Sequence, residues 1–368
     1  MPDAGRETVR DRNDDDARRT ERDPGAHSEP SSGGAEQAVE TQGESPLVRR
    51  ALSAAVSRET PDVITPPLEQ PEGPDTPIAR AAQAAVAMQN GQEEWPRPKA
   101  CRVMTVANQK GGVGKTTTTV NLAVSLALHG NRVMVVDLDP QGNASTALGV
   151  DHHADVPSIY HCLVEGRPLA EVAVEVEGIP NLLCVPATID LAGAEIELVS
   201  LVARESRLRR ACEAYDSDEL DYILIDCPPS LGLLTVNAMV AGSEVLIPIQ
   251  CEYYALEGLG QLLRNVELVQ AHLNPELQIS TILLTMYDGR TRLAQQVADE
   301  VRSHFGELVL STVIPRSVRV SEAPSYGQSV ITYDPGSTGA LAYKDAAKEM
   351  AYQNSGQVQP AGTEENQA

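Results

Sequence analysis

The sequence predicts a doubly wound α/β fold built on a mostly parallel β-sheet. From residue 102 onward, short runs rich in Val, Ile and Leu alternate with stretches long enough to form helices. The runs are apolar at successive positions, which is typical of strands that are covered on both faces of a sheet. Such alternation indicates a parallel sheet between two layers of helices, with its ligand at the carboxyl ends of the strands.

The predicted elements follow one another closely along the chain. The expected strands are residues 102–107, 132–139, 181–187, 222–228, 244–250 and 278–286. Helices are expected at Thr116–His129, which Gly130 follows, and at Glu257–His272, which Asn274-Pro275 follows. A glycine just after a helix and a proline shortly beyond it both favour helix termination, so these ends are well marked.

Composition divides the chain into three parts. Residues 1–99 are predicted to form a disordered arm, residues 100–353 a folded domain, and residues 354–368 a disordered tail. The first hundred residues hold 12 of the 25 prolines, with 12 basic against 19 acidic residues and almost no aromatic side chains. Such a segment cannot bury enough apolar surface to offset its chain entropy.

The arm contains one repeated motif. The sequence ESPLVRRA at residues 44–51 recurs as DTPIARAA at residues 75–82, 31 positions later. Each copy has Ser or Thr at a helix N-cap position, Pro at the first helical position, and then an aliphatic residue, Arg and Ala. Two interpretations stay open: two transient Ala-rich helices, or a duplicated docking motif that folds on a partner such as a polar scaffold.

Charge and cysteine usage exclude several classes of protein. No apolar run is as long as a membrane span needs, and the N-terminus lacks the apolar core of a signal peptide. The formal net charge of −23 opposes polyanion binding by the whole surface, so nucleic acid would need a local basic patch. The six cysteines lack close pairs, which argues against zinc or iron–sulfur sites and favours reduced core residues in a cytoplasmic protein. They are Cys101, Cys162, Cys184, Cys212, Cys227 and Cys251.

The first strand leads into a glycine-rich turn and a helix, in the sequence NQKGGVGKTTT at residues 108–118. Such a turn directs successive backbone N–H groups toward phosphate oxygens. We expect Lys115 to reach the β- and γ-phosphates and the Thr116 hydroxyl to bind Mg²⁺. The common phosphate-loop pattern has glycine five residues before Gly114, where this chain has Gln109 followed by a second lysine, Lys110.

Acidic residues end two other predicted strands. Asp137 and Asp139 lie two positions apart in VVDLDPQGN, so both side chains are expected on one side, near the phosphates. Asp226 ends the buried strand YILID, the position of a carboxylate that holds a Mg²⁺-bound water. The Pro228-Pro229 turn that follows is expected to sense the γ-phosphate.

These motifs together resemble the deviant Walker A motif, KGGxGKTT, and the second-strand and Walker B motifs of the ParA/MinD family of P-loop ATPases. The resemblance covers residues 102–352, and the downstream VIPRSVRVSEAPSYG points to its ParA/Soj chromosome-partition branch. It implies ATP and Mg²⁺ as cofactors and a weak, partner-stimulated ATPase activity. The implied catalytic residues are Lys110, Lys115 and Asp139; Lys110 crosses to the ATP of a second subunit, and Asp139 orients the attacking water.

The resemblance also assigns binding residues. The nucleotide-binding set is Lys110, Gly111, Gly112, Val113, Gly114, Lys115, Thr116 and Thr117, with Pro315 near the adenine. The implied Mg²⁺ site comprises Thr116, Asp137 and Asp226, the two aspartates acting through water. Arg290, Arg316 and Arg319 are expected to bind DNA phosphates without reading sequence, whereas Arg292 and Arg302 could instead pair with acids on exposed helices.

The function implied is an ATP-dependent homodimer that binds nucleoid DNA non-specifically. Such a dimer segregates a chromosome or plasmid with a centromere-bound, ParB-like partner. The alternative is a MinD-like or scaffold-type positioning ATPase that does not bind DNA. MinD attaches to membrane through a C-terminal amphipathic helix. The tail AYQNSGQVQPAGTEENQA is polar, acidic and interrupted by Gly and Pro, so no membrane partner is expected.

Overall fold

A computed structural model of the chain describes residues 93–215, 219–253 and 255–353. Most of the predicted arm, its repeated motif and the predicted tail lie outside the described residues. The described part contains one eight-stranded sheet in the order β3-β4-β2-β5-β1-β6-β7-β8. The strand pairs are parallel except for β3 and β4, which run antiparallel. The predicted fold class is confirmed.

All six predicted strands are present; four are one to three residues shorter than predicted, β6 matches, and β7 extends one residue further, to Tyr287. The strands are β1 (Arg102–Val106), β2 (Val133–Asp137), β3 (Val174–Glu175), β4 (Leu182–Val185), β5 (Tyr222–Asp226), β6 (Glu244–Gln250), β7 (Gln278–Tyr287) and β8 (Val309–Pro315). The sequence did not predict β3 or β8. Both are edge strands of this sheet, paired on one side only, so they lack the continuous apolar pattern of the central strands.

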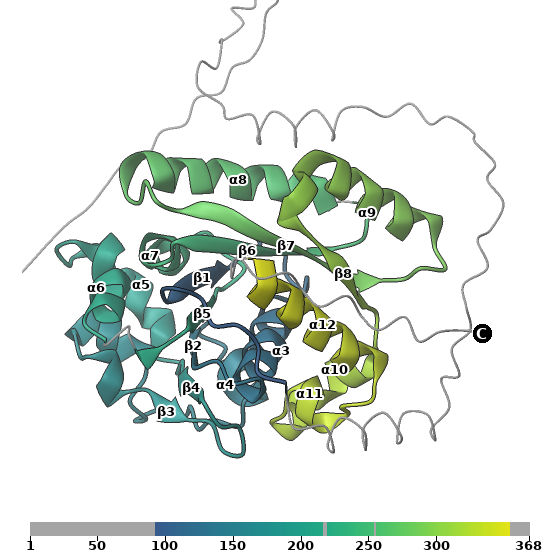
Figure 1. The fold of residues 1–368 in the computed structure, drawn as a ribbon. Helices are drawn as coiled ribbons and strands as arrows, with labels where there is room; N and C mark the ends of the chain where they lie inside the picture. Colours follow the sequence, from purple (N-terminus) through teal and green to yellow (C-terminus); the bar gives the residue numbers. More distant parts are fainter. Residues whose placement is uncertain (1–92, 216–218, 254, 354–368) are drawn as a thin grey trace, which may run out of the picture. The chain divides into compact units, whose positions relative to one another are not determined.

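Helices cover both faces of the sheet (Figure 1). On one face lie α5 (Leu191–Val199), α6 (Arg207–Glu213), α7 (Leu233–Ala241), α8 (Ala255–His272) and α9 (Arg292–Phe305). On the other lie α3 (Lys115–Leu128), α4 (Asn143–Ala147), α10 (Val318–Glu322), α11 (Val330–Tyr333) and α12 (Thr338–Gln353). Short turns connect them: a π-helix, His161–Glu165, and 3-10 turns at Leu169–Glu171, Arg204–Ser206, Gly306–Leu308 and Ala323–Tyr326.

The core consists of two clusters, one on each face of the sheet. In β2, Met134 and Val136 pack toward the α7 side while Val133 and Val135 pack toward α3, as the alternation of side chains along a strand requires. Both sets are fully buried. Five of the six cysteines are buried, and Cys101 is half-buried; all six are free thiols.

The first described residues are attached to the end of α3. The Trp95 ring stacks on His129 with a centroid distance of 3.7 Å, and the Trp95 N–H donates to the His129 carbonyl. Glu93 forms an ion pair with Lys348 of α12. Trp95 is buried in the cluster that contains α3 and α12, so the packed region begins before residue 100, where composition placed its start.

Candidate phosphate-binding site and comparison with known proteins

The glycine-rich segment forms the turn between β1 and α3, and Gly114 is the N-cap residue of α3. Gly112 and Gly114 have φ angles of 76° and 90°, a conformation that side chains with a Cβ rarely adopt. A Cβ built on Gly111, Gly112 or Gly114 would meet no atom within 4 Å, so these backbone segments are open to a ligand. The turn therefore has the conformation and the accessibility that close approach of phosphate requires.

Hydrogen bonds to neighbouring strands hold the turn in place. Asn108 Nδ2 donates to the Pro248 carbonyl at 2.8 Å, and Asn108 Oδ1 accepts from the Lys110 N–H at 3.0 Å. Thr285 Oγ1 donates to the Val113 carbonyl at 2.8 Å, and the Val113 side chain is buried. Strands β6 and β7 thus fix the shape of the turn from outside it.

Lys115 lies at the base of this turn, in the first turn of α3. The side chain is buried, which lowers the pKa of its ammonium group, although the nearby Asp226 carboxylate partly offsets this effect. Desolvation disfavours a buried charge unless an opposite charge is close. An anionic ligand at the turn would supply that charge.

Asp137 and Asp226 lie side by side at the carboxyl ends of β2 and β5. Both carboxyls are fully buried, and burial is the largest cause of the rise in pKa of each, followed for Asp226 by the charge of Asp137. Among the described residues, Asp226 Oδ2 is buried and has no hydrogen-bond partner, whereas Oδ1 accepts from Thr119 Oγ1 at 3.3 Å. A cation or its water would satisfy this oxygen, so the donor set fits a hard divalent ion.

Both oxygens of Asp137 accept hydrogen bonds. Oδ2 accepts from the Ser145 N–H at 2.8 Å and from Ser145 Oγ at 2.7 Å, and Oδ1 accepts from the Asp139 N–H at 3.2 Å. Asp139 is also buried, and its Oδ1 accepts from the Gln141 N–H at 3.0 Å. Asp137 therefore orders the segment that carries Asp139. Sequence reasoning missed Ser145 and Thr119, because neither lies inside a motif that marks it.

Lys110 pairs with a carboxylate outside the acidic motifs. Its ammonium group forms an ion pair with Glu252, which follows β6, and both side chains are partly exposed. Sequence reasoning did not identify Glu252 as a partner. The two lysines of the motif therefore differ: Lys115 is buried beside Asp226, whereas Lys110 is held near the surface by a single carboxylate.

Comparison with known proteins places this arrangement in a family. A family model described as an AAA domain matches residues 101–279. The sporulation initiation inhibitor protein Soj of Bacillus subtilis is 56% identical over 251 residues, which cover 68% of this chain and 98% of that protein. The chromosome partitioning protein ParA of Caulobacter vibrioides is 51% identical over 250 residues, 68% of this chain and 93% of that protein. The chain belongs to the ParA/Soj family.

Solved structures agree with this assignment. A Mycobacterium smegmatis protein described as cobyrinic acid a,c-diamide synthase, with bound ATP analogue and magnesium, is 40% identical with a TM-score of 0.58 and covers 67% of this chain and 93% of its own. The septum site-determining protein MinD of Pyrococcus horikoshii, complexed with Mg-ADP, is 28% identical with a TM-score of 0.55, covering 68% and 96%. The ParA/Soj assignment thus rests on sequence and fold together.

The three arginines expected at the ParA/Soj DNA surface are all exposed. Arg290 forms a two-point ion pair with Asp288, with both N–O distances at 2.9 Å. Arg319 contacts Glu322 at 3.0 Å and Asp334 at 3.3 Å. The pairing that the sequence suggested for Arg292 and Arg302 is not found in the described part of the chain, where Arg302 instead donates to the Ser311 carbonyl. Among the predicted DNA-binding arginines, carboxylates pair with Arg290 and Arg319.

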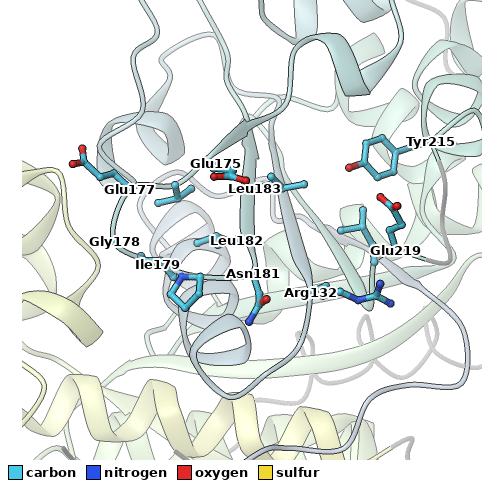
Figure 2. Close-up of a pocket in the computed structure, with 13 residues that line it drawn as sticks. Arg132, Glu175, Glu177, Gly178, Ile179, Asn181, Leu182, Leu183, Tyr215 and Glu219 are labelled. Carbon is cyan, nitrogen blue, oxygen red and sulfur yellow. The ribbon is translucent and has the colours of Figure 1, made fainter.

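A hollow of about 900 Å³ lies elsewhere on the sheet. Figure 2 shows Arg132, Asn181, Leu182 and Glu219 among the residues that line it. Arg132 precedes β2 and Leu182 begins β4, so this hollow lies at the amino ends of the strands. The glycine-rich turn and Asp226 lie at the carboxyl ends, so the hollow is separate from the phosphate-binding site.

Within residues 93–215, 219–253 and 255–353, no helix combines the length and apolar character that crossing a membrane requires.

Proposed function

We propose that this ParA/Soj-family chain is an ATPase that acts as an ATP-dependent dimerisation switch in chromosome or plasmid partition. In its ATP-bound form it dimerises, binds DNA non-specifically in the nucleoid, and is released when a ParB-like partner stimulates hydrolysis. The names of the relatives in Bacillus subtilis and Caulobacter vibrioides support partition as the process. We assign the ATPase to residues 100–353 together with the short segment around Trp95 that packs on α3.

The geometry around α3 supports ATP as the ligand. The open turn Lys110–Thr117 and the buried Lys115 bind the phosphates in this proposal, and the Thr116 hydroxyl and Asp226 hold Mg²⁺. When bound, Mg²⁺ would neutralise charge that develops on the phosphates. Pro315 ends β8, three strands from β1, which is about 14 Å at a spacing of ~4.8 Å. That separation suits an adenine whose phosphates lie at β1.

Asp139 is the residue proposed to orient the attacking water. It lies two residues beyond the end of β2, and its position is set by hydrogen bonds with Asp137 and Gln141. In this proposal Asp137 acts on the metal through water, while its oxygens also accept hydrogen bonds from Ser145 and Asp139. A positioned carboxylate that accepts the proton of the nucleophile is a common part of phosphoryl-transfer sites.

The observation that carries the dimer proposal is the position of Lys110. Within one chain it pairs with Glu252 near the surface and not with the buried carboxylates of the phosphate site. A partly exposed lysine on a phosphate loop is able to contact the triphosphate of a second subunit. Lysine supplied in trans makes dimerisation depend on the bound triphosphate and offsets charge during transfer.

DNA binding is assigned to Arg290, Arg316 and Arg319. All three are exposed, in loops or at the start of helices that follow the carboxyl ends of β7 and β8. A dimer carries two copies of this surface, so ATP raises DNA affinity by joining two sets of phosphate contacts.

The double variant Arg290→Glu with Arg319→Glu tests this surface. We expect it to lose binding to duplex DNA of random sequence in ATP at 50–100 mM salt, about the range in which phosphate contacts are strongest. ATP-dependent dimerisation, measured by sedimentation, should be unchanged, since neither side chain lies at the phosphate-binding turn. The control double variant Arg292→Glu with Arg302→Glu makes the same change of charge on α9 and should weaken binding far less. Full DNA binding by the double variant would place the DNA surface elsewhere.

A further inference from the structure

A small cavity lies between α6 and the turn that follows the π-helix His161–Glu165. Its volume is about 190 Å³. Among the described residues that line it, three are arginines, Arg167, Arg207 and Arg210, and none is acidic. The other lining residues are small or apolar, such as Cys162 and Gly166. Pockets for drug-sized ligands are larger, roughly 300–1,000 Å³, so this cavity has the size for a small ion or a single chemical group.

Two of the three arginines come from a basic stretch of an otherwise acidic chain. Residues 204–210, RESRLRR, contain four of the 17 lysines and arginines that follow residue 100, against 33 acidic residues over the same length. Arg207, Arg210, Ala211 and Ala214 follow the i, i+3, i+4, i+7 spacing that places side chains on one face of a helix. All four line the cavity, and the two alanines leave room beside the arginines.

Backbone carbonyls hold Arg207 in place without neutralising its charge. Its Nε donates to the Leu163 carbonyl at 2.7 Å and its Nη2 to the Val164 carbonyl at 2.9 Å. Both carbonyls belong to the π-helix, a rare element that is frequent at functional sites. Gly166 ends this element with a φ of 81°, and a Cβ built on it would lie 3.6 Å from Arg207 Nη2. The guanidinium group of Arg207 is therefore fixed beside the cavity and keeps its positive charge.

The other two arginines are exposed at the mouth of the cavity. The Arg210 side chain forms no hydrogen bond or ion pair with any residue that the structure describes. Arg167 pairs with Glu165 at 3.0 Å, and both side chains are 45% exposed. An ion pair that is this exposed contributes little, so an anion of higher charge is able to displace Glu165. Burial raises the pKa of the Cys162 thiol to about 12, so this wall of the cavity carries no negative charge.

We propose that this cavity binds the tetrahedral oxyanion of a phosphate group through the guanidinium groups of Arg167, Arg207 and Arg210. Arginine matches phosphate in geometry and charge, and one bidentate arginine already satisfies a carboxylate. Three arginines around one space instead match the three oxygens and the nearly double charge of a phosphate monoester. The ligand is inorganic phosphate or the phosphate of a phosphorylated side chain. This binding does not depend on the nucleotide or DNA functions proposed above.

Modification of the full chain by phenylglyoxal, read at each arginine by peptide mass spectrometry, tests the proposal. The reaction is run at about pH 8, where a phosphate monoester is a dianion. Inorganic phosphate should protect Arg167 and Arg210 in a saturable way, and at about ten times its dissociation constant it should slow their modification roughly tenfold relative to chloride at equal ionic strength. A parallel titration uses N-acetyl-phosphoserine amide. Equal protection by this compound would identify a phosphorylated side chain as a ligand, and protection by inorganic phosphate alone would identify the free ion.

The variant Arg210→Gln tests whether the arginines share one ligand. Arg210 is exposed, so the substitution leaves the core intact, and it should remove most of the phosphate protection of Arg167. The matched control Arg292→Gln removes the same charge from an exposed position on α9 and should leave the protection of Arg167 unchanged.

Three outcomes would overturn the proposal. The cavity would bind no phosphate if neither arginine showed saturable protection. Acetate that protects as well as phosphate would mean that the cavity takes a carboxylate instead. Protection of Arg167 that survives Arg210→Gln would mean that the two arginines do not bind one ion. Each result is read at these arginines without nucleotide, so phosphate bound at the glycine-rich turn does not contribute and a failure here is separate from a failure of the ATPase proposal.

Discussion

At the scale of single residues, the exposed arginines near the ends of β7 and β8 are held by neighbouring carboxylates. Arg290 hydrogen bonds lower the pKa of the Asp288 carboxyl to about 2, so Asp288 is charged at any ordinary pH. Arg319 is shared between Glu322 and Asp334. In the proposed DNA complex, a phosphate must replace carboxylates that already bind these arginines, so we expect the acids to lower DNA affinity.

Replacing Asp288 with asparagine tests this competition. Asp288→Asn keeps the oxygen that accepts from the Arg290 N–H but removes the charge that holds the guanidinium. We expect DNA affinity in ATP to rise roughly two- to fivefold at low salt, the range that exposed ion pairs commonly contribute. Fluorescence anisotropy with labelled duplex DNA measures the change. Asp299→Asn removes one exposed charge from α9 and serves as control; an equal gain from both variants would show a general charge effect instead.

The sequence predicted the motif residues of the site but not the residues that bind and position them. Lys115, Asp137, Asp139 and Asp226 could be placed because phosphate loops and acidic strand ends have recognisable spacing. Ser145 and Glu252 could not, since each reaches its partner only after the chain has folded back. Nothing local marks a serine eight residues after Asp137, or a glutamate 142 residues after Lys110, as a partner.

At the scale of elements, α3 connects the phosphate site to the start of the described chain. Its first residue is Lys115, and its C-cap, His129, lies under Trp95. Burial is the largest cause that lowers the pKa of His129 to about 4, and the ring Nδ1–H donates one hydrogen bond to the Ser125 carbonyl at 2.7 Å. The carbonyl requires a donor, so the neutral ring carries its proton on Nδ1.

This buried histidine makes stability depend on pH. Its pKa is lower in the folded chain than the ordinary 6.5, so the unfolded chain binds more protons between pH 6.5 and about 4. The contribution of His129 is therefore complete above pH 6.5 and is lost as the pH falls toward 4. We expect His129→Phe to reduce the loss of unfolding free energy between pH 7 and pH 5 by about 1–2 kcal/mol.

Urea unfolding followed by fluorescence measures this effect, because Trp95 is the single tryptophan of the chain. The comparison is between the two pH values within each variant, so a change in absolute stability does not matter. The exposed His272→Phe variant should keep the wild-type dependence. An unchanged dependence in His129→Phe would assign the acid sensitivity to other groups.

The pattern of correct and missed elements has a physical cause. The central strands β1, β2, β5 and β6 have helices on both faces, so their sequences are continuously apolar and easy to recognise. Strand β3 has two exposed residues and β8 includes exposed and half-buried ones, so neither carries that signal. Helix α3 was predicted within one residue at each end, because glycines flank it on both sides.

At the scale of the whole molecule, the proposed switch connects two separate surfaces. The phosphate site and Lys110 lie on the central strands, and the predicted DNA surface follows β7 and β8 near the edge of the sheet. One chain carries a single copy of each surface, and only a dimer carries two. In the proposed switch, ATP determines whether two chains associate, and association determines how many DNA phosphates are bound.

Sedimentation velocity of the Asp139→Ala chain, with and without Lys110→Ala, is the sharpest test of ATP-dependent dimerisation through Lys110. Asp139→Ala should slow hydrolysis, so ATP but not ADP should convert the chain to a stable dimer. Adding Lys110→Ala should leave ATP binding measurable, since Lys115 and the turn remain, yet keep the protein monomeric in ATP. A dimer of undiminished stability without Lys110, or one that forms equally well in ADP, would contradict the proposal that Lys110 links dimerisation to the triphosphate.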